Sequence, residues 1–414
     1  MLIKKEVLQI LDNNLNFLEK IKISFFLLFL SFILFGILHF IPDNSPTLIS
    51  PISKNIDKKE YEVFGFAPYW NINKLDNINF NVLTTLAYFD LPVNSSGYID
   101  GQSPGYRSFL SDSATQLFKK AHANGTRVVV TLTQMDNYSI TSLMDSPSAQ
   151  EGLINDTTSL VKKRGIDGVN IDFEYFGDPG EEYRSKFSNF VSNFTDEMHK
   201  QIPGSKVTVS VYASAIKDPK IYDIQTLANT TDGIFMMAYD FAVAGSQNAI
   251  PTSPLYGHKE GQYWYDISSA VDDFLTVMPS KKLILGLPWY GYNYPVYNPQ
   301  VMAQTAQGYW SNSWSQTYSD ANQMGSALTG WDNLGKVGWK AYAVNGAWRM
   351  IFMEDPKSLK IKYDYAKQKK LAGVGMWAMG NDYGKTELWD LLVNEFGAKL
   401  VNNQIVDKKI SDNV

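Results

Sequence analysis

Short apolar runs alternate with longer amphipathic stretches between residues 61 and 396. The apolar runs have the length and composition of buried β-strands, and the stretches between them carry apolar residues at helical spacing. We expect strands near residues 62–69, 82–89, 127–133, 167–174, 206–212, 233–239, 282–289 and 373–379. We expect helices near residues 107–124, 147–164, 181–201, 264–278, 357–370 and 385–396. Strands that alternate with helices form parallel sheets, and so many β/α units predict an α/β protein with a closed (β/α)8 TIM barrel.

One long segment interrupts this rhythm between the seventh and eighth expected strands. Residues 290–352 are too long for an ordinary loop. The segment contains several tryptophans, which are Trp310, Trp314, Trp331, Trp339 and Trp348. We expect a small inserted α+β subdomain that forms one wall of a cleft, with an additional layer of helices as the alternative.

A different pattern precedes the barrel. Residues 23–41 contain no Asp, Glu, Lys or Arg, and this segment is just long enough to cross a bilayer as a transmembrane helix. Lys20 and Lys22 precede it, so the positive-inside rule places residues 1–22 in the cytoplasm and the rest of the chain outside. A cleaved signal peptide is the alternative, which would make the protein secreted. The apolar core of a signal peptide is normally shorter, however, and no A-x-A-like cleavage site follows.

This interpretation defines the remaining domain boundaries. Residues 42–60 are rich in Pro, Asn, Ser and Lys and are expected to form a linker. The linker would tether an extracytoplasmic barrel domain at residues 61–396 to the membrane. Residues 397–414 are polar and without periodicity, and we expect them to be disordered.

The composition argues against several classes of function. The net charge of -5 provides no basic footprint for nucleic acid. Without cysteine the chain has neither disulfides nor thiolate ligands, and its four histidines show no paired metal-ligand spacing. We therefore expect no metal, no cofactor and a monomer. The aromatic content of 14% suits a glycan-binding cleft, although hydrophobic cores use aromatic residues too.

The most informative stretch is GIDGVNIDFEY at residues 165–175. Asn170, Asp172 and Glu174 alternate with apolar residues, so they share one face of the fourth expected strand. Strands of a parallel sheet are usually covered on both faces, where carboxylates are costly unless chemistry requires them. We interpret Asp172 and Glu174 as catalytic carboxylates, with a solvated face or a metal site as the alternative.

This stretch resembles the D-x-x-D-x-D-x-E signature of the family-18 glycoside hydrolases, the chitinases and their relatives. Asp167, Asp172 and Glu174 match the signature, and Asn170 stands where its middle Asp is usual. The resemblance extends to three further segments, which are Met237-Ala238-Tyr239-Asp240 for the M-x-Y-D motif, LILGLPWYGY at residues 283–292 for strand seven and GVGMWAMG at residues 373–380 for the last strand. The resemblance implies the same barrel fold.

The resemblance also implies roles for the matched residues. Glu174 would be the general acid and base, Asp172 would orient the acetamide group of the substrate, and the Tyr239 hydroxyl would hold its carbonyl oxygen. Trp377 would form a hydrophobic floor under the sugar, and Asp240 would contact the sugar. Four further residues are expected to bind substrate, which are Met237, Tyr69, Trp289 and Tyr292. Asn170 and Asp167 are expected to support the catalytic residues.

The spacing of the two carboxylates limits the mechanism. An ordinary retaining glycosidase places two carboxyl groups on opposite sides of the scissile bond, which neighbours on one strand face cannot easily do. The substrate-assisted route instead takes its nucleophile from the 2-acetamido group of an N-acetylhexosamine. Together with the resemblance, this predicts retaining hydrolysis of β-1,4 bonds in N-acetylglucosamine-containing glycans, such as peptidoglycan or chitin.

Two departures from the family pattern bear on the substrate. Thr131-Leu132-Thr133-Gln134 replaces the usual S-x-G-G on strand three, and Asn170 removes the carboxylate beneath Asp172. Asn170 can still hydrogen-bond to Asp172 but cannot take up its charge. Both features are more similar to the spore-cortex and peptidoglycan N-acetylglucosaminidases than to chitinases proper.

A catalytically silent, lectin-like barrel that binds glycan is the alternative function, and Asn170 leaves room for it. Silent relatives typically lose the terminal Glu of the signature, which is retained here as Glu174. A metal-dependent polysaccharide deacetylase is a weaker alternative, because such sites need several nitrogen or carboxylate ligands together and the chain has few histidines.

Overall fold

The computed structural model describes residues 60–306 and 312–397. The expected cytoplasmic segment and membrane anchor lie outside the described residues, as do the linker up to residue 59 and the tail from residue 398. Within the described ranges, no helix is both long enough and apolar enough to span a bilayer.

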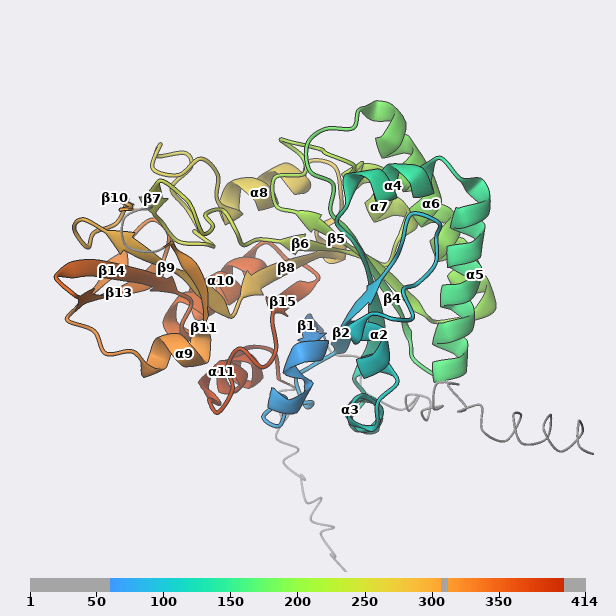
Figure 1. Ribbon diagram of the computed structural model, residues 1–414, viewed down its shortest axis with the longest axis horizontal. Helices are drawn as coiled ribbons and strands as arrows, with labels where there is room; N and C mark the ends of the chain where they lie inside the picture. Colours follow the sequence, from blue (N-terminus) through green and yellow to red (C-terminus); the bar gives the residue numbers. More distant parts are fainter. Residues whose placement is uncertain (1–59, 307–311, 398–414) are drawn as a thin grey trace, which may run out of the picture. The chain divides into compact units, whose positions relative to one another are not determined.

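Eight parallel strands close into a barrel in the order β1-β15-β8-β6-β5-β4-β3-β2 (Figure 1). The barrel strands are β1 (Glu62–Pro68), β2 (Thr85–Pro92), β3 (Arg127–Gln134), β4 (Gly168–Phe173), β5 (Lys206–Tyr212), β6 (Gly233–Met237), β8 (Leu283–Pro288) and β15 (Gly373–Trp377). This closed barrel with intervening helices confirms the predicted (β/α)8 fold. β2 begins at Thr85 rather than at residue 82, because Val82 and Leu83 donate their backbone N–H groups to the Asn79 carbonyl in a turn.

Helices cover the outside of the barrel (Figure 1). They are α2 (Pro104–Phe109), α3 (Asp112–Ala123), α4 (Asn137–Met144), α5 (Pro147–Arg164), α6 (Glu181–Gln201), α7 (Ile224–Thr230), α8 (Ile267–Phe274), α10 (Pro356–Gln368) and α11 (Glu387–Phe396), with 3-10 helices η1 (Tyr69–Lys74) and η2 (Ser280–Lys282). The helix expected at 107–124 is divided by Ser111, whose side chain accepts a hydrogen bond from Ala114 N and caps α3. α5 ends at Gly165, whose φ of 74° is a conformation that favours glycine.

The segment between β8 and β15 forms a five-stranded antiparallel sheet in the order β11-β9-β14-β13-β12. Its elements are β9 (Tyr290–Val296), β10 (Ala303–Gln304), β11 (Trp314–Thr317), α9 (Tyr318–Gln323), β12 (Leu328–Asp332), β13 (Val337–Val344) and β14 (Ala347–Met353). β10 pairs with β7 (Asn248–Ala249), which comes from the connection between β6 and β8. This sheet with its helix occupies the stretch where an α+β insertion is expected.

The insertion is attached to the rim of the barrel. Tyr318 N donates to Trp289 O at 3.1 Å, and Ser319 N donates to Asn381 O at 2.9 Å. A buried ion pair joins Glu354, which follows β14, to Lys362 in α10. Loss of either partner would leave an unpaired buried charge, so this pair holds the end of the insertion against the barrel helix.

Alternation along the strands separates two layers of packing. Inward-facing apolar residues fill the barrel, and outward-facing ones pack against the helices. In the interior, Phe66 packs edge-on against Phe235 with 4.9 Å between the ring centroids. A buried polar layer lies on the inner faces of β3, β4 and β5 and consists of Thr131, Asn170, Thr208 and Ser210. Because side chains fill the interior, a ligand can reach it only from an end of the strands.

Candidate active site

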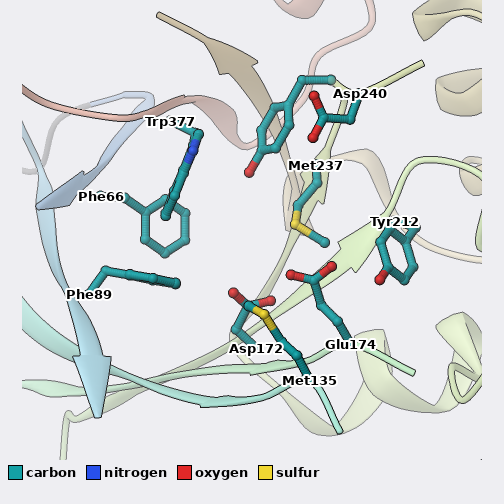
Figure 2. Close-up of a pocket in the computed structure, with 10 residues that line it drawn as sticks. Phe66, Phe89, Met135, Asp172, Glu174, Tyr212, Met237, Asp240 and Trp377 are labelled. Carbon is teal, nitrogen blue, oxygen red and sulfur yellow. The ribbon is translucent and has the colours of Figure 1, made fainter. Parts of the chain in front are cut away.

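A pocket opens at the C-terminal ends of the barrel strands, where active sites of such barrels lie. Its volume is about 180 Å³. That is below the roughly 300 Å³ or more of sites for drug-sized ligands and suits a group about the size of one sugar ring. The pocket is lined by Phe66, Phe89, Met135, Asp172, Glu174, Tyr212, Met237, Tyr239, Asp240 and Trp377 (Figure 2). In the described part of the chain, no group of three or more His, Asp or Glu side chains is arranged to hold a metal ion.

Asp172 and Glu174 form one side of the pocket. Asp172 lies on β4 and is 4% exposed. Glu174 follows the strand, and its N–H donates to Gln134 O at 2.9 Å, which continues the ladder between β3 and β4. Residues two apart on a strand point to the same face and lie about 6.6 Å apart along it. The structure therefore brings these two carboxyl groups to the same side of the pocket (Figure 2).

Burial raises the pKa of both carboxyl groups. The pKa of Asp172 is raised first by desolvation and then by the negative charges of Glu174 and Asp90. Desolvation also raises the pKa of Glu174; the neighbouring Tyr212 hydroxyl opposes this shift, and the charge of Asp240 adds to it. Two acids that interact this closely lose their protons as a pair. The pair therefore keeps a proton to higher pH than an exposed carboxyl group would, as a general acid requires.

Two tyrosine hydroxyls belong to the same pocket. Tyr212 ends β5, and Tyr239 follows β6. Burial and the nearby carboxylates raise the pKa of both hydroxyls, so each remains a hydrogen-bond donor. Tyr239 was predicted from the sequence, whereas Tyr212 was not. The missed signal was the alternation of KVTVSVY, which places Tyr212 on the same inner face as Ser210.

Asp240 is held in place by the insertion. Its Oδ1 accepts hydrogen bonds from the Tyr290 hydroxyl at 2.5 Å, the Tyr292 hydroxyl at 3.0 Å and Thr252 Oγ1 at 3.1 Å. Its backbone φ of 59° lies in the left-handed region, which Asp tolerates better than most residues. Two of the three donors come from β9, so the insertion orients a residue of the pocket.

Aromatic side chains form the side of the pocket away from Glu174 (Figure 2). The Trp377 ring lies 4.7 Å from Phe89 and 5.5 Å from Phe66, measured between centroids. Trp70 lies 6.5 Å from Trp377 and is 53% exposed, so it extends this surface toward solvent. Flat apolar faces of this kind pack well against the ring hydrogens of a sugar.

Two predicted substrate-binding residues face away from the pocket. Inner-face residues on β8 have even numbers, so Trp289 faces outward, where it is completely buried and packs edge-on against Trp389 at 5.3 Å. Tyr69 begins the 3-10 helix η1 after β1, does not line the pocket and packs against the outer core. The prediction for Trp289 is wrong, because its side chain is completely buried. On the side of Tyr69, the exposed Trp70 is the residue that lies beside Trp377 of the pocket.

Tyr292 differs from its prediction in another way. The residues that line the pocket do not include it, although Asp240 and Met237 are among them. Its hydroxyl is bound to Asp240. Tyr292 therefore acts on the site through Asp240 rather than as part of the pocket wall.

The two predicted supporting residues hydrogen-bond to groups other than the carboxyl pair. Asp167 precedes β4 at its N-terminal end, where its Oδ2 contacts His122 Nε2 at 2.6 Å and accepts from Val128 N at 2.7 Å. It lies about 16 Å along the strand from Asp172. Asn170 Nδ2 donates to Ser210 at 3.0 Å, and its Oδ1 accepts from Thr208 on β5 at 2.9 Å. Asn170 is thus bound to β5, and the hydrogen bond expected to Asp172 is replaced by these two.

Several known proteins are similar to this chain in sequence or in fold. Human di-N-acetylchitobiase is 26% identical over 301 residues, which cover 67% of this chain and 75% of that protein. The cortical fragment-lytic enzyme of Bacillus subtilis is 20% identical over 300 residues, which cover 70% of this chain and 64% of that enzyme. The crystal structure of Ostrinia furnacalis group IV chitinase in complex with allosamidin shares the fold. It has a TM-score of 0.71 and 20% identity and covers 82% of this chain and 100% of that chitinase.

The sequence model of the glycosyl hydrolases family 18 matches residues 62–382, which is well over half of the chain. The matched range contains all ten residues of the pocket. The family match, the closed barrel and the carboxyl pair at the end of β4 lead to one conclusion. This protein belongs to the family-18 glycosyl hydrolases.

Proposed function

We propose that this protein hydrolyses β-1,4 bonds beside N-acetylglucosamine by retaining, substrate-assisted catalysis. The observation that carries the proposal is the placement of Asp172 and Glu174 on one inner face of β4, in a pocket suited to one sugar ring. A carboxyl pair on one side of the sugar can supply a proton and stabilise a positive charge. It cannot also attack the opposite face of the anomeric carbon. The nucleophile is then the acetamido oxygen of the substrate.

The first step breaks the glycosidic bond. Glu174 in its acid form donates its proton to the leaving oxygen, while the acetamido carbonyl oxygen forms a bond to the anomeric carbon. The resulting oxazolinium carries a positive charge on the former acetamide. The Asp172 carboxylate accepts a hydrogen bond from its N–H and stabilises this charge. The Tyr239 hydroxyl orients the attacking oxygen.

The second step releases the sugar. Glu174 is now a carboxylate and takes a proton from a water molecule that attacks the anomeric carbon. The bond to the acetamido oxygen breaks and the acetamide is restored. Two inversions at one carbon retain the β configuration.

Asp240 is the other carboxylate that could act as a nucleophile. Burial raises the pKa of Asp240, and the hydrogen bonds from Tyr290, Tyr292 and Thr252 oppose this shift. All three hydrogen bonds go to Oδ1, so they occupy that oxygen and fix the orientation of the carboxyl group. Asp240 therefore fits a role in holding a sugar hydroxyl rather than in covalent attack.

We expect Tyr239→Phe to lower kcat about 10²-fold to 10³-fold with little change in protein stability. The variant loses one donor that orients the attacking oxygen, and removal of one such donor typically costs about 10²–10³ in rate. The measurement is kcat on an N-acetylglucosamine oligomer. Tyr294→Phe is the matched control, because Tyr294 is a buried tyrosine of the insertion outside the pocket. Equal rates for the two variants would remove Tyr239 from the reaction.

The favoured substrate is a bacterial cell-wall glycan. The departures at Asn170 and at Thr131–Gln134, together with the similarity to a protein named as a cortical fragment-lytic enzyme, support this choice over chitin. A domain anchored outside the membrane by residues 23–41, as the sequence predicts, would have direct access to peptidoglycan.

A lectin-like barrel is the second candidate function, and Asn170 is the observation that favours it. Asn170 replaces a carboxylate of the family signature by a group that cannot accept a proton. The retained Glu174 and its raised pKa favour catalysis instead.

The test uses the full-length protein and three substrates. These are N-acetylglucosamine oligomers, glucosamine oligomers of the same length and purified peptidoglycan, with products weighed by mass spectrometry. The proposal predicts cleavage of the first and third substrates and no cleavage of the second, which lacks the acetamido group. Comparable cleavage of the glucosamine oligomers would exclude the substrate-assisted route. Binding of glycan without any cleavage would favour the lectin.

A further inference from the structure

The strand β2 contains an irregularity next to the pocket. Tyr88 pairs with Val130 of β3, but the next pair is Leu91 with Leu132, so two residues of β2 lie opposite Thr131 alone. These two residues are Phe89 and Asp90. Tyr88 and Leu91 both face the outer core, whereas Phe89 belongs to the inner core. A bulge of this kind re-aims a side chain, and here it places Asp90 on the inner side directly after Phe89.

Thr133 on β3 holds Asp90 in this position. Its Oγ1 donates a hydrogen bond to Asp90 Oδ2 at 2.5 Å. Thr133 is also in register with Asp172 on β4, and side chains of paired residues on neighbouring strands point to the same face about 4.8 Å apart. Asp90, Thr133 and Asp172 therefore form a continuous row across three strands. Thr133 stands where the family pattern S-x-G-G has a glycine, which could not supply this hydroxyl.

The side of Asp172 facing the barrel interior lacks a carboxyl partner. Asn170, the residue beneath it on β4, uses its amide for Thr208 and Ser210. Asp172 Oδ1 is buried, and none of the described residues hydrogen-bonds to it. Besides Glu174, the carboxyl group whose charge raises the pKa of Asp172 is Asp90 at the β2 bulge.

We propose that Asp90 is a positioning residue that substitutes for the missing carboxylate beneath Asp172 and sets the proton balance of the Asp172–Glu174 pair. Asp90 does so from a neighbouring strand, through the β2 bulge and the hydroxyl of Thr133. The two departures from the family pattern then belong together, since Asn170 removes one carboxylate and Thr133 fixes another. This inference rests on the proposed hydrolase function.

The electrostatics of the site agree with this role. Three effects raise the pKa of Asp172. Burial is the largest, the charge of Glu174 is the second and the charge of Asp90 is the third. Burial raises the pKa of Asp90 itself, and the Thr133 hydroxyl lowers it. The other titratable groups around Asp172 come from β5 and from the end of β6 and are Tyr212, Tyr239 and Asp240. The pocket lining contains no Lys, Arg or His, so no cation offsets these charges.

The sign of the effect follows from these neighbours. A negative Asp90 disfavours each ionisation of the carboxyl pair, so it moves both limbs of the pH–activity profile to higher pH. Asp90→Asn removes that charge. We expect both limbs of the kcat/KM profile to move to lower pH by about one unit, the shift that one nearby charge commonly produces.

Two further variants separate this role from a structural one. Thr133→Val removes the donor that favours the charged form of Asp90, so it should shift the profile in the same direction by a smaller amount. Asp100→Asn makes the same change of charge at an exposed site in the loop after β2 and should leave the profile unchanged. Thermal unfolding of each variant reports any loss of folding.

The inference is supported if Asp90→Asn and Thr133→Val shift the profile toward acid and Asp100→Asn does not. If the two limbs of the kcat/KM profile lie at the wild-type pH in both Asp90→Asn and Thr133→Val, the inference is overturned. The proposed function would remain intact in that case. If Asp90→Asn fails to fold, Thr133→Val decides by the same criterion. An inactive wild-type protein on every substrate would instead overturn the proposed function, and this inference with it.

Discussion

Glu174→Gln is expected to lower kcat about 10³-fold while glycan binding is retained, since general acid–base catalysis typically contributes about 10²–10⁴. Gln has nearly the shape of Glu, but it can neither donate a proton to the leaving oxygen nor take one from water. Both steps of the reaction therefore fail at the same residue. The measurement is kcat on an N-acetylglucosamine oligomer, with the dissociation constant of the same oligomer measured by calorimetry.

Glu181→Gln is the matched control for this result. Glu181 begins α6, shortly after Glu174 in the chain, and its side chain is 79% exposed. Its exposed ion pair with Arg184 contributes little to stability. We expect wild-type activity from this control. Activity of Glu174→Gln within a few-fold of the control would show that another group transfers the proton.

Asp172→Asn is expected to lower kcat about 10²-fold and to raise the melting temperature by a few degrees at neutral pH. The loss of rate follows because a neutral amide cannot stabilise the positive charge of the oxazolinium, and one such electrostatic contact is worth about 10²–10³. The gain in stability follows because burial and Glu174 disfavour the charged form of Asp172, and so raise its pKa in the folded protein.

The gain in stability of Asp172→Asn depends on pH, and its sign follows from the raised pKa of Asp172. The folded protein binds the Asp172 proton more tightly than the unfolded chain, in which the pKa of Asp is about 3.9. The wild-type protein therefore loses stability as pH rises from that value through the folded pKa. The Asn variant has no such proton and shows no such loss. Melting temperatures of both proteins between pH 4 and 8 should diverge as pH rises; parallel curves would contradict the charge assigned to Asp172.

The fold and the carboxyl pair could be predicted because they depend on local patterns. Apolar runs and helical spacing mark each β/α unit, and the bounds of α5 and α6 agree with the expected 147–164 and 181–201. The carboxylates Asp172 and Glu174 were found because β4 alternates without interruption. The period of a strand decides which face a residue takes, whatever the rest of the fold does.

The site residues were predicted wrongly where the family resemblance was given more weight than the inward and outward alternation of side chains along a strand. Others were missed where that alternation is interrupted. Trp289 was expected in the pocket, yet the alternation along β8 continues to Trp289 and turns it outward. Tyr69 was also expected there, but it begins a 3-10 helix after β1 and packs against the outer core. Asp90 could not be placed from its pattern, because a bulge interrupts the period of β2 and only the pairing with β3 shows it. The support of Asp240 by Tyr290 and Tyr292 is likewise a contact between distant segments, which no local pattern reports.

The configuration of the first product tests the central claim most directly. The full-length protein is mixed with an N-acetylglucosamine oligomer, and the proton NMR signal of the new reducing end is followed before mutarotation mixes the anomers. Attack by the acetamido oxygen and then by water, with Glu174 as acid and base, predicts that the β-anomer appears first. An initial excess of the α-anomer would mean that water attacks directly, and it would contradict the substrate-assisted account.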